Sequence, residues 1–174
     1  SSAASDVYKR QINGRLFETF LNATLRGKSL GQYFTPRSVV KLAVAMSDLQ
    51  VGIKHQGCDV VIDGCCGSGG FLIEALAAMW KKVESSPKLS QAAKNELKND
   101  IATKCIYGID SAKDPALARI ARMNMYLHGD GGSAIYQLDA LDKGLAEENN
   151  ASPESRSELR DFKRVLKDLS LIHI

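Results

Sequence analysis

Apolar positions recur at helical spacing in the first quarter of the chain. Within residues 15–25 they recur every three or four positions, which predicts an amphipathic helix that Gly27 would end. Thr35 followed by Pro36 is typical of a helix start, with the threonine as N-cap and the proline as first helical residue. This second helix should run to about Leu49.

Short β-branched runs and longer helical patterns alternate in the rest of the chain. The predicted strands are 58–62, 104–110 and 133–138, and the predicted helices are 71–83, 91–103 and 115–129. A polar stretch at 146–158 indicates a surface insertion, within which Ser152 and Pro153 start a last helix to about Leu166. Strands that alternate with helices predict an α/β domain with a parallel sheet.

Composition narrows the class of protein only a little. A chain of 174 residues that is 44% hydrophobic can form one domain or part of a larger one. A formal charge of +3 does not by itself indicate nucleic acid as a partner. No apolar run approaches the roughly 20 residues that span a bilayer, and the start lacks a signal-peptide pattern, so we expect a soluble cytoplasmic protein without a membrane partner. The four cysteines contain no C-x-x-C pair and are interpreted as reduced thiols, with no metal site.

The two ends of the chain resemble translated sequencing adapter. Residues 1–11 ("SSAASDVYKRQ") match a translated transposon-end adapter, and residues 169–174 ("LSLIHI") match the reverse complement of its end. We therefore expect the natural segment to be 12–168, and the natural protein to continue beyond Asp168.

The stretch "DVVIDGCCGSGGFLIEAL", residues 59–76, leads from a predicted strand through a glycine loop into a helix. Gly67, Gly69 and Gly70 would let backbone N–H groups approach a ligand at the helix N-terminus. A nicotinamide fingerprint would need glycine at the position of Leu72, and a phosphate loop would need a G-K-S or G-K-T ending. A bulky residue at Gly69 should block the ligand and leave the fold intact.

Two carboxylates follow the strands that flank this loop. Asp63, at the end of the first strand, would repel a pyrophosphate and would suit a cationic or amine-bearing ligand. Asp110 follows the next strand, where a carboxylate can accept hydrogen bonds from ribose hydroxyls. The pattern thus leaves a cationic or amine-bearing group near Asp63 and a ribose near Asp110 as candidate ligand parts.

Four segments in order carry a resemblance to a known family: "GQYFTPRSVV", "VVIDGCCGSGGFLIEAL", "YGIDSAKDPALARIARMNMYLHG" and "LDAL". Together they resemble the motifs of the N6-adenine DNA methyltransferases, specifically the modification subunit of type I restriction-modification systems. The family's usual D-P-A-C-G-S-G-G is changed here, with Gly64 and Cys65 in place of the proline and alanine. The resemblance implies a Rossmann-like S-adenosylmethionine-dependent methyltransferase fold, truncated before its fourth strand. Residues 12–29 would end an N-terminal helical region, and 30–168 would form the first part of the catalytic domain.

The same resemblance implies a cofactor site for S-adenosylmethionine. Its binding residues would be Gln32, Tyr33, Phe34, Thr35, Pro36, Arg37, Asp63, Gly67, Ser68, Gly69, Gly70, Asp110 and Asp139. In the family, the segment from Gln32 to Arg37 lies against the methionine end of the cofactor. Asp63 and the glycine loop would bound its amino-acid part, Asp110 would hold the ribose, and Asp139 would face the adenine amino group.

Several of these residues have simpler interpretations. Tyr33 and Phe34 are also suited to a hydrophobic core, and Asp63 could be an ordinary turn carboxylate. Asp139 and its neighbour Asp142 could both be solvated loop residues.

The family's catalytic N-P-P-F or N-P-P-Y loop occurs nowhere in the chain, so no catalytic residue is assigned. The resemblance implies double-stranded DNA, a specificity subunit and a second modification subunit as partners, and leaves a restriction subunit open. We expect this chain alone to be inactive. The alternatives are another class of adenine N6 methyltransferase with its own recognition domain, and a dinucleotide-dependent oxidoreductase.

Overall fold

A computed structural model describes residues 19, 35–113, 116–129, 134–141 and 153–170. The elements follow in the order α2 (Arg37–Ser47), η1 (His55–Gly57), β1 (Val61–Asp63), α3 (Gly70–Ser85), α4 (Gln91–Lys104), β2 (Ile106–Ile109), α5 (Leu117–Leu127), β3 (Ala134–Tyr136) and α6 (Pro153–Ser170). The predicted α/β class is confirmed. The helix predicted within 15–25 lies, apart from Thr19, outside the described residues.

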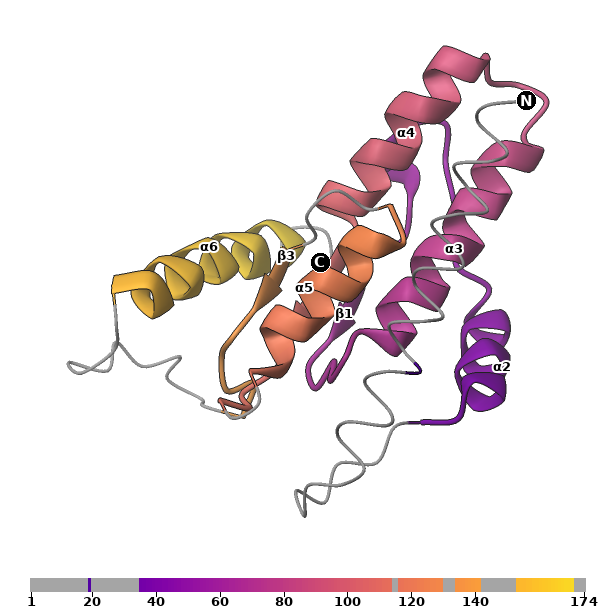
Figure 1. Cartoon of the computed structure of the whole chain (residues 1–174). Helices are drawn as coiled ribbons and strands as arrows, with labels where there is room; N and C mark the ends of the chain where they lie inside the picture. The colour runs from indigo at the N-terminus through magenta and orange to yellow at the C-terminus, as the bar shows by residue number, and fades with distance from the viewer. Residues whose placement is uncertain (1–18, 20–34, 114–115, 130–133, 142–152, 171–174) are drawn as a thin grey trace.

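The three strands form a parallel sheet in the order β1-β2-β3. Figure 1 shows α3 beside α4 and α5, with strands behind α5 and with α6 next to β3. Because the strands are parallel, their carboxyl ends meet at one edge of the sheet. The loop that follows β1 and the residues that follow β2 and β3 are therefore neighbours.

The two faces of the sheet are covered differently. On one face Gly108 of β2 lies under α3, since a Cβ at this position would be 2.7 Å from Leu72 Cδ1. On the other face the Tyr136 ring packs against Phe162 of α6, with ring centroids 5.4 Å apart. Ile62 of β1 pairs with Tyr107 in register and is 42% exposed. Helix α6 therefore covers the β3 end of this face, and the β1 end is open among the described residues.

The core lies between the sheet and helices α3, α4 and α5. Its fully buried members include Leu72, Leu76, Met79, Val83, Ile101, Ile106 and Met125. Helix α2 packs against α3 through Val40 and Val44, while Val39, Leu42 and Met46 on the same helix are exposed. The apolar pattern thus marks the buried faces of α3 and α5 and overstates the burial of α2.

Three boundaries, in two elements, differ from the prediction because of local hydrogen bonds and backbone conformation. Helix α2 starts one residue late, because the Val39 and Val40 N–H groups donate to the Pro36 carbonyl oxygen and place the proline at the N-cap. It ends at Ser47, where Asp48 turns into the left-handed region at φ 46°. Strand β1 starts at Val61 instead of residue 58, because the Asp59 N–H donates to Gln50 O and is not part of the ladder.

The remaining elements agree more closely with the pattern. Helices α3 and α4 lie within three residues of their predicted bounds at each end. Helix α5 begins at Leu117, and Pro115, its predicted start, is outside the described residues. Helix α6 starts at Pro153 as predicted but continues to Ser170, past the predicted end near Leu166.

Candidate functional site

The glycine loop connects β1 to α3 through two residues in the left-handed region. Gly67 has φ +55°, and Gly69, the N-cap of α3, has φ +85°. The Gly69 N–H donates to the Cys66 carbonyl oxygen at 2.8 Å, and its own carbonyl accepts from Ile73 N–H at 2.9 Å. Only glycine adopts these angles without a steric penalty, so the loop conformation depends on both residues.

One side of this loop is packed and the other is open. A Cβ at Gly69 would lie 3.5 Å from the Ala121 Cβ on α5. At Gly67 and Gly70 no described heavy atom lies within 4 Å of the corresponding position. The expectation that a bulky residue at Gly69 leaves the fold intact stays a prediction, and the contact with α5 and the left-handed backbone indicate that such a residue would strain the loop. The open side, where a ligand can approach, is at Gly67 and Gly70.

Asp110 joins the loop to the end of β2. Its Oδ2 accepts from the Gly67 N–H at 3.0 Å, and its Oδ1 accepts from the Ala112 N–H at 2.9 Å. Its own N–H donates to the Tyr136 carbonyl oxygen at 3.1 Å, and the residue is 9% exposed. Each carboxylate oxygen keeps one lone pair for a further donor. The side chain therefore fixes the loop and can still accept a hydrogen bond.

Asp63, the last residue of β1, is the second carboxylate of the site. Its Oδ1 accepts from the Cys65 N–H at 3.1 Å. Burial raises the pKa of the Asp63 carboxyl, the Cys65 hydrogen bond opposes this, and the negative charge of Asp110 raises it further. A positively charged ligand group placed here would relieve the cost of ionising Asp63.

The residues after β3 also reach the loop. A Cβ at Gly64 would lie 3.6 Å from the Ala140 Cβ, so the turn that follows β3 passes beside Asp63. Asp139 is exposed in this turn, and its Oδ1 accepts from the Leu141 N–H at 2.9 Å. Asp142 lies outside the described residues.

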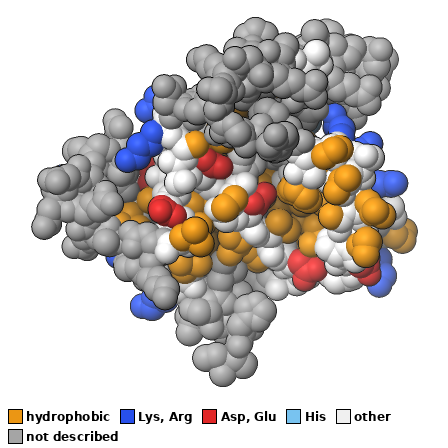
Figure 2. All heavy atoms as spheres, turned by 90° about the horizontal axis from the view of Figure 1, so that it is seen from below, with side chains coloured by type: hydrophobic (Ala, Val, Ile, Leu, Met, Phe, Trp, Pro, Cys, Tyr) orange, Lys and Arg blue, Asp and Glu red, His pale blue; other side chains and the backbone are white. Residues whose placement is uncertain are grey.

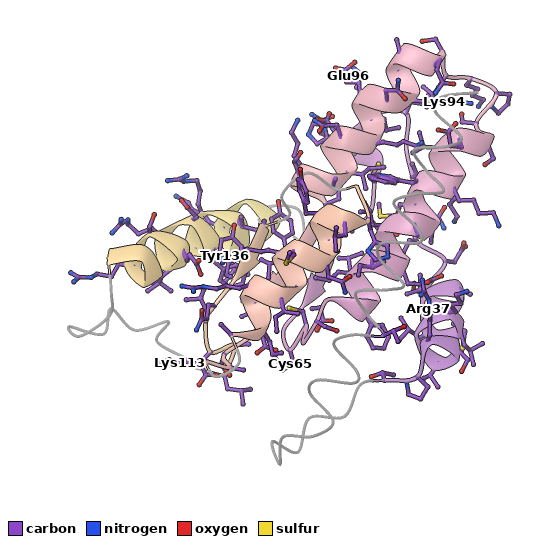
Figure 3. All side chains as sticks on the ribbon, in the orientation of Figure 1. Arg37, Cys65, Lys94, Glu96, Lys113 and Tyr136 are labelled. Carbon is purple, nitrogen blue, oxygen red and sulfur yellow. The ribbon has the colours of Figure 1, made fainter. Side chains whose placement is uncertain are left out.

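The segment predicted to lie against the methionine end is only partly described. Thr35, Pro36 and Arg37 are exposed at the start of α2, while Gln32, Tyr33 and Phe34 lie outside the described residues. Figure 3 labels Arg37 on α2 and Cys65 on the glycine loop, so these residues come from separate elements. Among the described residues, the packing of α2 on α3 connects this segment to the loop.

The two loop cysteines have different surroundings. Cys66 is 6% exposed, and its N–H donates to the Ile109 carbonyl oxygen at 2.9 Å. Burial, with the charges of Asp63 and Asp110, raises the pKa of the Cys66 thiol to about 12. Cys65 is exposed. All four cysteines are free, as predicted, and Cys66 is a packing residue.

Sequence reasoning missed one polar residue at the site. Asn124 of α5 is fully buried, and its Nδ2 donates to the Ser68 carbonyl oxygen at 2.9 Å. The available signal was an asparagine on the apolar stripe of α5, in line with Leu117 and Ala121.

Acidic and apolar side chains share one face of the molecule. Figure 2, which views the molecule from below, shows acidic groups set among hydrophobic ones, with part of the surface covered by grey atoms. The described residues contain no group of three or more His, Cys, Asp or Glu side chains placed to hold a metal ion. None of their helices is long and apolar enough to cross a membrane.

A glycine loop at the carboxyl edge of a parallel sheet, with acidic residues after the adjoining strands, is an arrangement typical of α/β domains that bind a cofactor. The family model described as N-6 DNA methylase matches residues 8–155, and the chain belongs to this family. The family resemblance seen in the motifs is thereby confirmed.

Several curated relatives are restriction-modification proteins. The chain is 32% identical over 125 residues to the methylase subunit of the type I restriction enzyme MjaIX from Methanocaldococcus jannaschii, which covers 71% of the chain and 18% of that protein. It is 36% identical over 115 residues to the type II restriction enzyme and methyltransferase RM.BcgI from Heyndrickxia coagulans. This match covers 66% of the chain and 15% of that protein. It is 31% identical over 135 residues to the methylase subunit of the type I restriction enzyme HindI from Haemophilus influenzae, covering 76% and 25%. The chain thus spans between about a seventh and a quarter of the length of these relatives.

Proposed function

We propose that this chain is the S-adenosylmethionine-binding part of a DNA methyltransferase that modifies adenine at N6 in a type I restriction-modification system. Membership of the N-6 DNA methylase family supports the reaction class. The names of the MjaIX and HindI relatives support the type of system. The whole protein would act on double-stranded DNA with a specificity subunit and a second modification subunit.

The observation that carries the proposal is the open side of the glycine loop between two carboxylates. A Cβ added at Gly67 or Gly70 would meet no described heavy atom within 4 Å, and Asp63 and Asp110 flank the loop. S-adenosylmethionine carries a sulfonium and an ammonium, which favour such an acidic site, whereas a pyrophosphate would be repelled. The residues present therefore fit this cofactor better than a dinucleotide.

Within this site, Asp63 and the loop residues Gly67, Ser68, Gly69 and Gly70 would bound the amino-acid part of the cofactor. Asp110 would accept from the ribose hydroxyls through its remaining lone pairs. Asp139 would face the adenine amino group. The segment from Gln32 to Arg37 would complete the site at the methionine end.

The finer description of the fold belongs to the same proposal. In a Rossmann-like methyltransferase sheet, a fourth strand would pair with the edge of β1 that is unpaired among the described residues. The N-P-P-F or N-P-P-Y motif that holds the target adenine would follow that strand. Residues 12–29 would close an N-terminal helical region, 30–168 would belong to the catalytic domain, and 1–11 and 169–174 would be adapter-derived. The chain by itself would then bind cofactor without methylating DNA.

A calorimetric titration tests cofactor binding directly. S-adenosylmethionine should bind to the wild-type chain, and NAD should not. Gly70→Leu should weaken S-adenosylmethionine binding by at least about tenfold, because the new side chain fills the open side. Gly70 lies outside the left-handed region, so the urea unfolding midpoint should not fall.

Equal affinity of Gly70→Leu and the wild type would contradict the placement of the ligand. Binding of NAD in preference to S-adenosylmethionine would contradict the choice of cofactor. The type of system has a separate test in the natural gene. A gene for a specificity subunit should follow, whereas a recognition domain in the same polypeptide would favour another class of adenine methyltransferase.

A further inference from the structure

Helix α5 holds the back of the glycine loop through one side chain. Asn124 is fully buried, and its Nδ2 donates to the Ser68 carbonyl oxygen at 2.9 Å across 56 residues of sequence. Three positions earlier on the same helix, Ala121 faces Gly69. Two consecutive loop residues are thus fixed by α5, one by a hydrogen bond and one by contact.

The Oδ1 atom of the Asn124 amide indicates that the hydrogen bond from Nδ2 to Ser68 does more than fill space in the core. Its Oδ1 is buried and has no hydrogen-bond partner in the part of the chain that the structure describes. A buried acceptor without a donor destabilises the folded state. Leucine would fill nearly the same volume without that cost, but it could not donate to the loop.

The bond fixes the orientation of one peptide unit. The Ser68 carbonyl and the Gly69 N–H belong to the same peptide plane, with the carbonyl turned to Asn124 and the N–H donating to Cys66 O at 2.8 Å. If this plane flipped, the Gly69 N–H would leave the Cys66 carbonyl oxygen and the Ser68 carbonyl oxygen would face it instead, so the turn that leads into α3 would be lost. The N–H groups of the first turn of α3 follow directly on this turn, and unpaired N–H groups at a helix start attract anionic groups.

We propose that Asn124 is a positioning residue for the cofactor: by holding the Ser68 carbonyl against α5, it keeps the N–H groups at the start of α3 turned to the open side, where the carboxylate of an amino-acid ligand would bind. This inference rests on the proposed function, because it needs S-adenosylmethionine at the loop. It also makes a claim about the loop alone, namely that the donor on Asn124 maintains its conformation.

Three variants of the 174-residue chain separate these claims. Asn124→Leu removes the donor, and Asn124→Asp replaces it at nearly constant size. Met125→Ala is the matched control, because Met125 is the next residue, is fully buried and packs in the core. Each variant is measured for S-adenosylmethionine affinity by calorimetry and for urea stability. The rate at which a thiol-reactive aromatic disulfide modifies Cys66 without cofactor is followed by peptide mass spectrometry.

Asn124→Leu and Asn124→Asp should each weaken S-adenosylmethionine binding at least about tenfold and speed Cys66 modification by a similar factor. Cys66 is buried under the loop, so its modification reports loop opening. Met125→Ala should weaken S-adenosylmethionine binding and speed Cys66 modification only as far as its lower stability explains. Asn124→Asp should regain affinity relative to the wild type as the pH falls, because a protonated carboxyl can donate to the Ser68 carbonyl, and burial favours that form.

Unchanged affinity and unchanged Cys66 modification in folded Asn124→Leu would overturn the inference while leaving the proposed function intact. If the wild type itself does not bind S-adenosylmethionine, the proposed function and the cofactor-positioning role fail together. Faster Cys66 modification would in that case still support the anchoring of the loop by Asn124. If Asn124→Leu does not fold, the pH response of Asn124→Asp decides, and its absence would overturn the inference.

Discussion

Asp63 retains its proton to a higher pH in the folded chain than in the unfolded one, since burial raises its pKa. Between the ordinary value of about 3.9 and this raised value, the folded state binds more protons than the unfolded state. The contribution of Asp63 to stability therefore decreases as the pH rises through this window. At neutral pH the ionised side chain destabilises the fold.

Asp63→Asn should accordingly raise the free energy of unfolding at neutral pH, and this gain should shrink as the pH falls toward 4. The asparagine can still accept from the Cys65 N–H, so the turn is preserved. Urea titrations of both proteins across the acid range give the difference, in which the effects of other carboxylates cancel. A gain that grows on acidification would contradict the raised pKa. The same variant should bind S-adenosylmethionine more weakly, because the negative charge is lost.

Gly69 and Gly70 are adjacent, but replacing each by alanine should affect the free energy of unfolding differently. Gly69→Ala should lower the free energy of unfolding by about 1–2 kcal/mol, because a non-glycine residue is strained in the left-handed region. Gly70→Ala is the control and should not lower it, because its backbone is unstrained and its Cβ position is open. Chemical denaturation of the two variants checks the contrast. Equal effects would mean that the two glycines have the same role.

The sequence predicts where the site carboxylates lie but not how they are used. Asp63 and Asp110 could be placed because parallel strands end at a common edge. The bonds from Asp110 to the Gly67 and Ala112 N–H groups could not be foreseen, since they depend on how the loop folds back over β2. The position of Asn124 on the apolar stripe of α5 was a signal, but its partner could not be foreseen, because a backbone carbonyl leaves no signature in the sequence.

Among the elements, α6 is attached to the sheet by a charged side chain as well as by Phe162. Glu158 Oε1 accepts from Arg122 Nη2 at 2.5 Å, and its Oε2 accepts from the Gln137 N–H at 2.7 Å. Arg122 also donates from Nε to the Ile135 carbonyl oxygen at 2.7 Å. One carboxylate thus connects α6, α5 and the end of β3.

Glu158→Ala should lower the free energy of unfolding by about 1–2 kcal/mol, since both ends of a charge-assisted bridge are lost. Glu158→Gln keeps an acceptor for the Gln137 N–H and should cost less. Far-UV circular dichroism reports the total helix content, to which α6 contributes, while fluorescence of Trp80 reports on α3 and α4 alone. If α6 detaches first in Glu158→Ala, the two transitions should separate. Identical stability of the alanine variant and the wild type would show that the bridge does not hold α6.

The positions of helices and strands could be predicted where the spacing of apolar residues or an N-cap residue determines them. Ser90 accepts from the Ala93 N–H at 3.3 Å and caps α4 at its predicted start. The start of β1 was predicted wrongly, because β-branched composition does not reveal that Asp59 bonds to Gln50. The bounds of α2 depend in the same way on local bonds around Pro36 and Asp48.

At the scale of the molecule, β1 pairs with β2 and has no second partner among the described residues. An unpaired edge with an apolar side chain favours association between copies. Ile62→Lys should therefore reduce concentration-dependent association without lowering the unfolding midpoint. Sedimentation velocity over a range of concentrations measures this.

Leu42→Lys is the matched control, because Leu42 is an exposed apolar residue on α2, away from the sheet edge. It should leave the association of the wild type largely unchanged. A larger effect from Leu42→Lys than from Ile62→Lys would assign the association to α2.

Gly108 of β2 lies beneath both ends of the glycine loop. A Cβ there would meet Leu72 Cδ1 at 2.7 Å and Cys66 Sγ at 3.1 Å, so the residues that enter and leave the loop rest on the same glycine. The two ends of the loop, Cys66 and Leu72, therefore lie close together above Gly108, and residues 67–71 form a compact loop between them. We therefore expect that this segment can be exchanged for the corresponding loop of a relative without shifting α3, provided that its contacts Gly108, Asp110, Ala121 and Asn124 are retained.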